Sequence, residues 1–317
     1  MPNYEKRSQD EFEDIEQESL DFELVEVSQV YGEAGDEDPS EDPDEDEDSV
    51  ENEEDAVEVA LPELAGLAAG DSKAWRFKSS EEEITGLLER GTFGGLKLVP
   101  WGSNYTFIAP LCDEQDGQLY AVIYKPVRGE APLWDFPNGT LYKREHAAYL
   151  VSRALDWNFI PPVVVREGPH GVGTVQLFVD VDEKVQYYDF RDQHVKELKR
   201  IAVFDYITNN ADRKAGHCLL GVDGFIWGID HGLCFNYEPK LRTVIWEFAG
   251  EPIPEDIYND LLELATDGPR LHQLTGHLGE LLTQREVNTF ISRLERLLQN
   301  PIFPGLTSRR QIPWGFF

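Results

Sequence analysis

After residue 80, the pattern of hydrophobic and polar positions predicts one short helix followed by several strands. Residues Glu81–Arg90 read as a short helix that ends at Gly91. Three strand-like runs follow at residues 96–100, 105–110 and 119–124, with turn signals at 102–104 and 114–117. Two more runs, at 163–166 and 174–179, enclose a Gly-rich segment at 170–173 that predicts a hairpin turn.

Helical spacing dominates further along the chain. Residues 141–155 predict a long helix, because their apolar side chains recur mostly at intervals of three or four residues. Residues 192–208 and 287–298 predict two more helices, with short strands at Cys218–Leu220 and 225–229 between them. Strands first and helices later predict an α+β fold of two lobes. We expect a tail at 1–63, a strand-rich lobe at 64–180 and a mainly helical lobe at 181–317, the two lobes forming one domain.

Charge separates the first sixty residues from the rest of the chain. These residues hold 26 of the 61 acidic side chains and two of the 28 basic ones, so they carry most of the formal net charge of −33. Such a segment buries too little apolar surface to fold alone, and we expect a disordered acidic tail. Apolar residues between Phe12 and Val27 leave two interpretations open: a solvated tail, or a motif that docks on a protein partner.

Composition excludes several classes of protein. The negative charge repels phosphate backbones, so we expect no nucleic-acid partner. No apolar run reaches the roughly 18 residues of a transmembrane segment, and the N-terminus lacks the layout of a signal peptide. Three cysteines, Cys112, Cys218 and Cys234, are too few and too far apart for a disulfide framework. These features predict a cytoplasmic protein.

The residues with the clearest chemistry lie between 203 and 235. A predicted helix leads into a loop that holds Asp212 and, five residues later, His217, and a strand then ends at Asp230. Phosphoryl transfer needs one carboxylate to orient the acceptor hydroxyl, and a second carboxylate with another ligand to hold Mg²⁺ against the phosphates. In the protein-kinase template, a metal-binding asparagine follows the catalytic aspartate by five residues, and a metal-binding aspartate comes later in the chain. The three residues fit that order.

Several segments resemble a known family. The sequence FDYITNNADR (204–213) is similar to the catalytic loop of type II phosphatidylinositol 4-kinases, and IDHGLCF (229–235) to their metal-binding strand end. KREHAAYL (143–150) and IPPVVV (160–165) resemble the helix that bridges the lobes and the next strand. The whole sequence resembles a bacterial branch of the phosphatidylinositol 3-/4-kinase-like superfamily, in which segments like YKPVRGEAPLWDFP (124–137) recur. The resemblance covers about residues 88–300 and implies a two-lobed, protein-kinase-like (lipid-kinase-like) fold.

The resemblance also implies a role for single residues and a pair of cofactors. Lys125 matches the lysine that pairs with phosphate, and Glu145 matches its ion-pair partner. Asp212 matches the catalytic-loop aspartate, and Asp230 matches the metal-binding aspartate. ATP and Mg²⁺ are the cofactors that these matches imply.

Further residues complete the expected site. Backbone N–H groups of Ser103 and Asn104, in the first strand turn, are expected to cover the phosphates. Lys214 is expected to offset charge on the transferring phosphoryl group, and Arg213 either braces the loop or contacts phosphate. The segment 134–139 either caps the nucleotide or is only a packed connection. The adenine-contacting hinge of the family falls on Gln176, Leu177, Phe178 and Val179.

His217 departs from the family pattern, which has Asn at this position. Imidazole is a softer ligand than an amide oxygen and suits Mn²⁺ or Zn²⁺ better than Mg²⁺. Three interpretations are open. His217 ligates through nitrogen and shifts the preference towards Mn²⁺, it holds a water on the metal, or Asn210 supplies the second oxygen instead.

Three functions are compatible with these residues. The first is an ATP- and divalent-metal-dependent phosphotransferase that acts on an acceptor hydroxyl. The second is a nucleotide-binding pseudokinase or interaction module, which the change at His217 favours. The third is a metal-dependent phosphohydrolase with Asp212, His217, Asp230 and His231 as ligands. The sequence favours the first, with a protein or small-molecule acceptor over a phosphoinositide, because anionic lipid repels an acidic tail.

Overall fold

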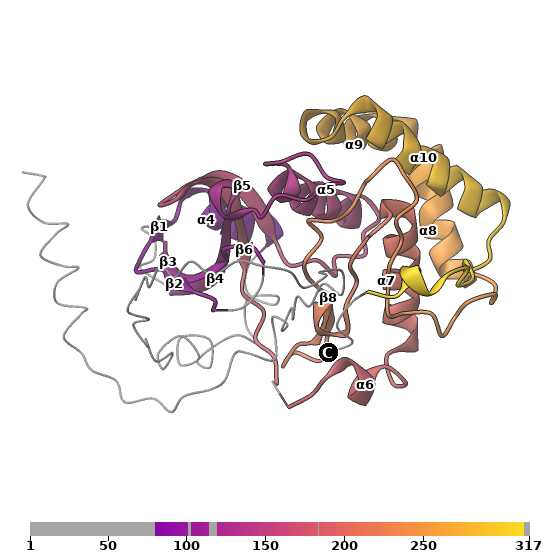
Figure 1. The fold of residues 1–317 in the computed structure, drawn as a ribbon, viewed down its shortest axis with the longest axis horizontal. Helices are drawn as coiled ribbons and strands as arrows, with labels where there is room; N and C mark the ends of the chain where they lie inside the picture. The colour runs from indigo at the N-terminus through magenta and orange to yellow at the C-terminus, as the bar shows by residue number, and fades with distance from the viewer. Residues whose placement is uncertain (1–79, 101–102, 114–118, 183, 314–317) are drawn as a thin grey trace, which may run out of the picture.

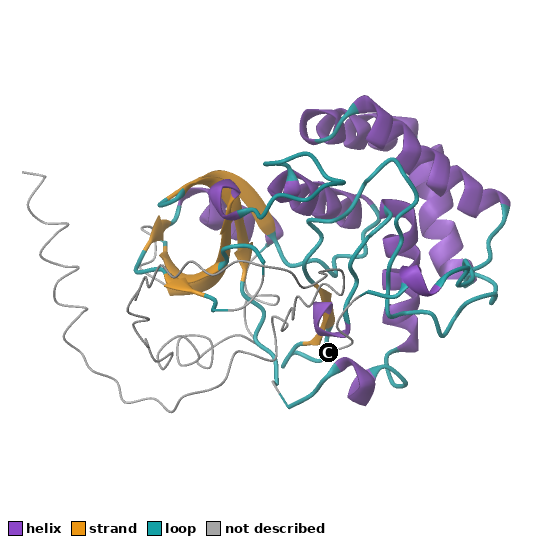
Figure 2. Ribbon diagram, viewed as in Figure 1, coloured by secondary structure: helices purple, strands orange, loops and turns teal. Residues whose placement is uncertain are grey.

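Two lobes of different composition make up the described part of the chain (Figure 1). The computed structural model describes residues 80–100, 103–113, 119–182 and 184–313. The predicted tail at 1–63 and the predicted start of the strand-rich lobe at residue 64 lie outside these residues. One lobe is a curled antiparallel sheet and the other consists mainly of helices (Figure 2). The predicted two-lobed α+β fold is confirmed.

The sheet lobe holds six strands in the order β1-β3-β4-β6-β5, with β2 pairing the free part of β3. The strands are β1 (Thr92–Phe93), β2 (Lys97–Leu98), β3 (Phe107–Cys112), β4 (Leu119–Pro126), β5 (Val163–Gly168) and β6 (Gly171–Leu177). Helix α4 (Glu81–Arg90) starts at a capping box formed by Ser80 and Glu83. It packs Ile84, Leu87 and Leu88 into one apolar cluster with buried side chains of β3, β4, β5 and β6.

Strand ends differ from the sequence-based prediction in several places: β4 and β5 end two residues later than predicted, and β6 begins three residues earlier. The run expected at 105–110 is shifted to Phe107–Cys112, and the run at 96–100 shrinks to Lys97–Leu98. Strand β1 was not predicted, since a two-residue strand leaves no periodic signal. The strand expected to reach residue 179 ends at Leu177, because the chain leaves the sheet there for the helical lobe. The hairpin turn is confirmed: Gly168 pairs with Gly171 across a two-residue loop.

The helical lobe surrounds a large apolar core. Its helices are α6 (Tyr187–Phe190), α7 (Val195–Thr208), α8 (Glu255–Thr266), α9 (Gly268–Leu281) and α10 (Gln284–Gln299), and a small hairpin joins β7 (Cys218–Leu220) to β8 (Ile226–Gly228). Single-turn 3₁₀ helices lie at η2 (Val127–Gly129), η3 (Ala215–His217) and η4 (Arg309–Gln311). Helix α7 begins three residues later than predicted, after a turn at 191–193.

Among the helices that the structure describes, none combines the length and apolarity needed to cross a membrane.

Helix α5 (Leu141–Ala154) lies between the lobes (Figure 1). Its apolar side chains belong to the core of the helical lobe, and it also contacts β5 and β6. The buried guanidinium of Arg144 donates to the Glu286 carboxylate at 2.6 Å and to the Cys234 carbonyl at 2.8 Å. Glu286 in turn caps α10 through Thr283. Helix α5 is therefore anchored to the helical lobe by a buried ion pair.

We expect the Glu286→Ala variant to lose about 3–5 kcal/mol of unfolding free energy, because it leaves the Arg144 charge buried without its partner. Urea unfolding followed by circular dichroism measures this loss. The Glu263→Ala variant is a matched control, since it breaks an exposed helix-surface ion pair with Arg270. Equal stabilities of the two variants would contradict an anchoring role for Glu286.

Candidate active site

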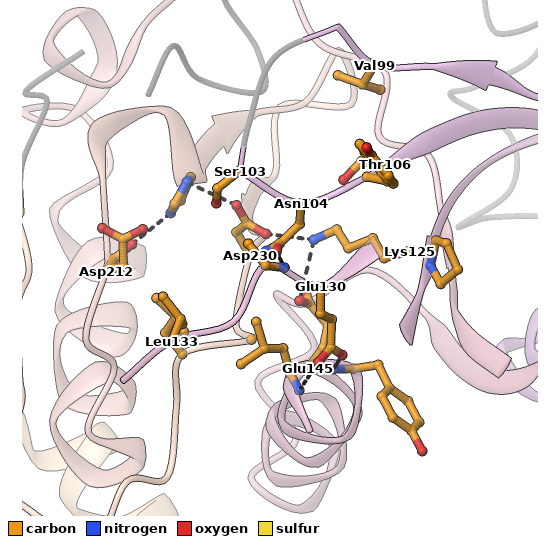
Figure 3. Close-up of a pocket in the computed structure, with 18 of the residues that line it drawn as sticks. Val99, Ser103, Asn104, Thr106, Lys125, Glu130, Leu133, Glu145, Asp212 and Asp230 are labelled. Carbon is orange, nitrogen blue, oxygen red and sulfur yellow. Dashed lines mark hydrogen bonds and ion pairs between the residues drawn. The ribbon is translucent and has the colours of Figure 1, made fainter. Parts of the chain in front are cut away.

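A cavity opens where the sheet lobe, α5 and the helical lobe meet (Figure 3). Charged side chains from all three parts line it. Of the predicted site residues, the cavity brings together Ser103, Asn104, Lys125, Glu145, Asp212, Lys214, His217 and Asp230. These residues are separated by up to 127 positions in the chain, so only the fold makes them one site.

Lys125 joins the lobes at the centre of this cavity. Its ammonium lies 2.6 Å from Oδ1 of Asp230 and 3.4 Å from Oε2 of Glu145 (Figure 3). Burial opposes a charge on Lys125, but the two carboxylates outweigh it and raise its pKa. Burial likewise opposes ionisation of Asp230, yet Lys125 holds the pKa of that carboxyl well below its usual range. Lys125 and Asp230 are therefore both charged at neutral pH.

Glu145 is held from two sides. The side chain is 4% exposed, its Oε2 faces Lys125, and its Oε1 accepts a hydrogen bond from the backbone N–H of His231 at 3.2 Å. Burial raises the pKa of the Glu145 carboxyl. Because α5 is anchored to the helical lobe, this residue fixes the position of Lys125 relative to the Asp230 strand end.

His217 contacts the second oxygen of the same aspartate. Its Nε2 lies 3.2 Å from Oδ2 of Asp230, and its Nδ1 lies 2.9 Å from the carbonyl oxygen of Asp212. The same Nδ1 also accepts from the backbone N–H of Lys214 at 3.4 Å, so it faces both an acceptor and a donor. Burial lowers the pKa of His217 to about 4, so the ring is neutral at pH 7. The ring therefore connects the loop that carries Asp212 to the Asp230 carboxylate.

Asp212 lies on the other side of the cavity, near Lys214. The Lys214 ammonium is 3.6 Å from Oδ2 of Asp212, and burial raises the pKa of the Asp212 carboxyl to about 6 although Lys214 opposes that rise. A carboxylate with a pKa in this range ionises at neutral pH and still accepts a proton readily. The geometry fits a base or an orienting group for a hydroxyl.

A buried network holds the loop that carries Asp212. The guanidinium of Arg213 pairs with both oxygens of Asp205 and donates to the carbonyls of His217 and Ile229. A further contact of 2.6 Å joins it to Nε2 of His231. Arg213 and Asp205 are both fully buried, so this network ties α7, the loop and the β8 strand end together.

Two predicted site residues therefore lie behind the cavity instead of in it. The contacts of Arg213 brace the loop, and Arg213 is not among the residues that line the cavity. The amide of Asn210 donates to Asp205 and accepts from the Asp212 N–H, and Asn210 is completely buried. Its oxygen is directed at the loop backbone, so the structure does not place it as a metal ligand.

The predicted hinge residues also lie outside the cavity lining. Gln176 and Leu177 are buried in the sheet lobe, and Val179 packs against Leu219, Trp227 and Ile229. In the connecting segment, Leu133 lines the cavity while Trp134 is 88% exposed, with the Lys240 ammonium 4.6 Å from its ring. This segment is thus partly a cavity wall and partly surface.

The cavity is also lined by Val99, Thr106 and Glu130, which were not predicted as site residues (Figure 3). Val99 and Thr106 flank the predicted phosphate-covering turn, which could have signalled them. Glu130 lies in a loop whose path depends on contacts far along the chain, so no local pattern indicates its place.

The geometry agrees with the comparisons to known proteins. A family model described as phosphatidylinositol 3- and 4-kinase matches residues 97–301. This chain belongs to that family. It is therefore a kinase-like enzyme, and the family resemblance predicted from the sequence is confirmed.

Relatives of the family extend across bacteria and plants. Protein Rv2133c of Mycobacterium tuberculosis is 40% identical over 269 residues, covering 73% of this chain and 94% of that protein. Phosphatidylinositol 4-kinase gamma 4 of rice is 34% identical over 131 residues, covering 34% of this chain and 23% of the rice protein. The proinflammatory kinase CtkA of Helicobacter pylori superposes with a TM-score of 0.43 at 10% identity, covering 68% of this chain and 94% of that one.

We expect the Asp212→Asn variant to be more stable than the wild type at pH 7 to 8, by about 1–3 kcal/mol. The folded-state pKa of Asp212 lies above its ordinary value, so the carboxyl costs no stability below pH 4 and destabilises the fold as the pH rises through about 6. Asparagine avoids that cost. Urea unfolding at pH 4 and pH 8 tests the sign, with the exposed Asp192→Asn as control. A stabilisation that is equal at both pH values would contradict the shifted pKa.

Proposed function

We propose that this chain is an ATP- and divalent-metal-dependent phosphotransferase that acts on a hydroxyl group of a protein or small molecule. The observation that carries the proposal is the Lys125–Asp230 ion pair between the lobes, with Glu145 behind it and Asp212 across the cavity. In phosphoryl transfer the lysine pairs with phosphate oxygens, and the aspartate holds the metal ion that binds the phosphates. The free protein holds the two groups together.

Each side chain has a distinct task in this proposal. Lys125 pairs with phosphate oxygens of ATP and is oriented by Glu145. Asp212 orients the acceptor hydroxyl and accepts its proton, while Lys214 offsets negative charge on the phosphoryl group in flight. Ser103 and Asn104 line the cavity, and their backbone N–H groups would cover the phosphates.

The donors that face each other at Asp230 and His217 fit a divalent metal ion. A neutral imidazole beside a carboxylate oxygen is a pair of side chains of the kind that divalent metal ions bind. Mg²⁺ bound at kinase-type sites takes one or two side chains and completes its shell with phosphate oxygens and water. A metal ion held here would neutralise charge on the phosphates, and the nitrogen ligand favours Mn²⁺ more than an amide oxygen would.

The structure gives less support to a phosphohydrolase built from four ligands. His231, the fourth expected ligand, is fully buried and directs its Nε2 at Arg213. Its ring packs against Phe159 and Phe204. It therefore belongs to the network behind the loop and does not face the cavity.

We expect ATP turnover, measured as ADP formation at saturating ATP, to rise with pH through about 6 and to level off above 7, because Asp212 acts in its ionised form. The Asp212→Asn variant should lose roughly 10²- to 10⁴-fold in kcat. Its affinity for ATP, measured by isothermal titration calorimetry, should stay close to that of the wild type. The Asp192→Asn variant is the control. Wild-type turnover in Asp212→Asn would refute the assigned role.

A further inference from the structure

The segment between β4 and α5 runs along the turn that is expected to cover the phosphates. The backbone N–H of Tyr105 donates to the Gly129 carbonyl at 2.9 Å, and the N–H of Ala131 donates to Oδ1 of Asn104 at 2.7 Å. The approach is close: a Cβ on Gly129 would lie 2.6 Å from the Cβ of Tyr105. No side chain fits there, so glycine is required for this contact.

Glu130 connects the same segment to the start of α5. Its Oε2 accepts from the N–H of Leu141 at 3.1 Å, and its Oε1 accepts from the N–H of Tyr142 at 2.8 Å (Figure 3). The residue that precedes the helix, Thr140, gives no side-chain cap of its own. A carboxylate at a helix N-terminus satisfies free N–H groups and complements the helix dipole. Glu130 therefore caps α5 from eleven residues upstream.

We propose that Glu130 is a positioning residue that couples the phosphate-covering turn to α5. Asn104, Gly129, Glu130 and Ala131 together form what we call the latch. The α5 end of the latch is fixed, because the Arg144–Glu286 ion pair anchors that helix to the helical lobe. The other end holds the turn at Asn104 and Tyr105 over the cavity.

The latch holds the phosphate-covering turn in place before the nucleotide binds. Glu145 lies one helical turn after the residues that Glu130 caps, and it orients Lys125. Helix α5 thus positions both the phosphate-covering turn and the pair formed by Lys125 and Glu145. A turn held in this way needs no ordering when the nucleotide binds, which lowers the barrier to a productive complex. This inference rests on the proposed function, since it concerns the nucleotide phosphates.

A purely structural cap is the competing explanation, and the chain offers a matched control. Glu83 also accepts from a backbone N–H at a helix start, that of Ser80 at 2.6 Å, and belongs to the capping box of α4. It is not among the cavity-lining residues. Removing either carboxylate costs a cap, but only Glu130 is linked to the turn.

The experiment compares the full chain with Glu130→Ala, Glu130→Gln, Asn104→Ala, the Glu130→Ala/Asn104→Ala double variant and Glu83→Ala. The probe is ATP with Mg²⁺ or Mn²⁺, and kcat and KM are taken from ADP formation. Glu130→Ala should lower kcat/KM roughly 10- to 100-fold. Glu130→Gln keeps one acceptor oxygen and should recover part of this loss. The double variant should be no worse than the poorer single variant within about twofold, since the two residues act as a unit.

Glu83→Ala should lower the melting temperature about as much as Glu130→Ala but leave kcat/KM within about twofold of wild type. Amide hydrogen exchange in the nucleotide-free protein supplies a readout that does not depend on catalysis. Exchange at Tyr105 should accelerate in Glu130→Ala and not in Glu83→Ala. Unchanged exchange at Tyr105, or equal kinetics for the two carboxylate variants, overturns the latch. Faster exchange in Glu130→Ala with no ATP turnover by the wild type overturns the proposed function instead.

Discussion

The ion pair between Lys125 and Asp230 is the interaction on which the site depends. It joins the sheet lobe to the helical lobe across the cavity, and Glu145 stabilises it from α5. Four carboxylates, Glu130, Glu145, Asp212 and Asp230, line one cavity together with only two lysines. Like charges at such spacing raise one another's pKa or require cations. Lys125 meets this requirement in the free protein, and a nucleotide with its metal ion would have to take over part of it.

This electrostatic arrangement is possible because buried contacts hold its members in place. The Arg213–Asp205 pair fixes the loop that carries Asp212 and His217, and the Arg144–Glu286 pair fixes the helix that carries Glu145. Both pairs are buried at positions where removing one partner would leave an uncompensated charge. The catalytic side chains are half-exposed or lie at the cavity wall, whereas the groups that position them are inside. One set of residues, the buried ion pairs, therefore holds the site in place, and a different set supplies the charges that line the cavity.

Features that depend on order and spacing along the chain were predictable from the sequence. The two-lobed fold followed from strands preceding helices, and the cavity residues Lys125, Glu145, Asp212 and Asp230 followed from matching motifs. The directions of side chains within one loop were not readable, because Asn210, Asp212 and Arg213 are near neighbours whose side chains point to opposite sides. The latch was not readable either, since Glu130 reaches α5 through a loop path that only tertiary contacts define. The expected hinge was predicted from the family resemblance, and the residues that line the cavity do not include it.

The central claim is that Asp230, with Lys125 and His217, forms a metal-dependent site for nucleotide phosphates. The most direct test is the thermal shift caused by ATP with Mg²⁺, with Mn²⁺ and without metal, in the wild type and in Asp230→Asn. Asparagine tolerates the left-handed backbone of this position, where φ is 62°, so the variant removes the charge with little strain. A ligand that binds only the folded state raises the melting temperature by mass action. The account predicts a metal-dependent rise in the wild type that Asp230→Asn loses. A rise of the same size in both proteins, or none with either metal in the wild type, would contradict it.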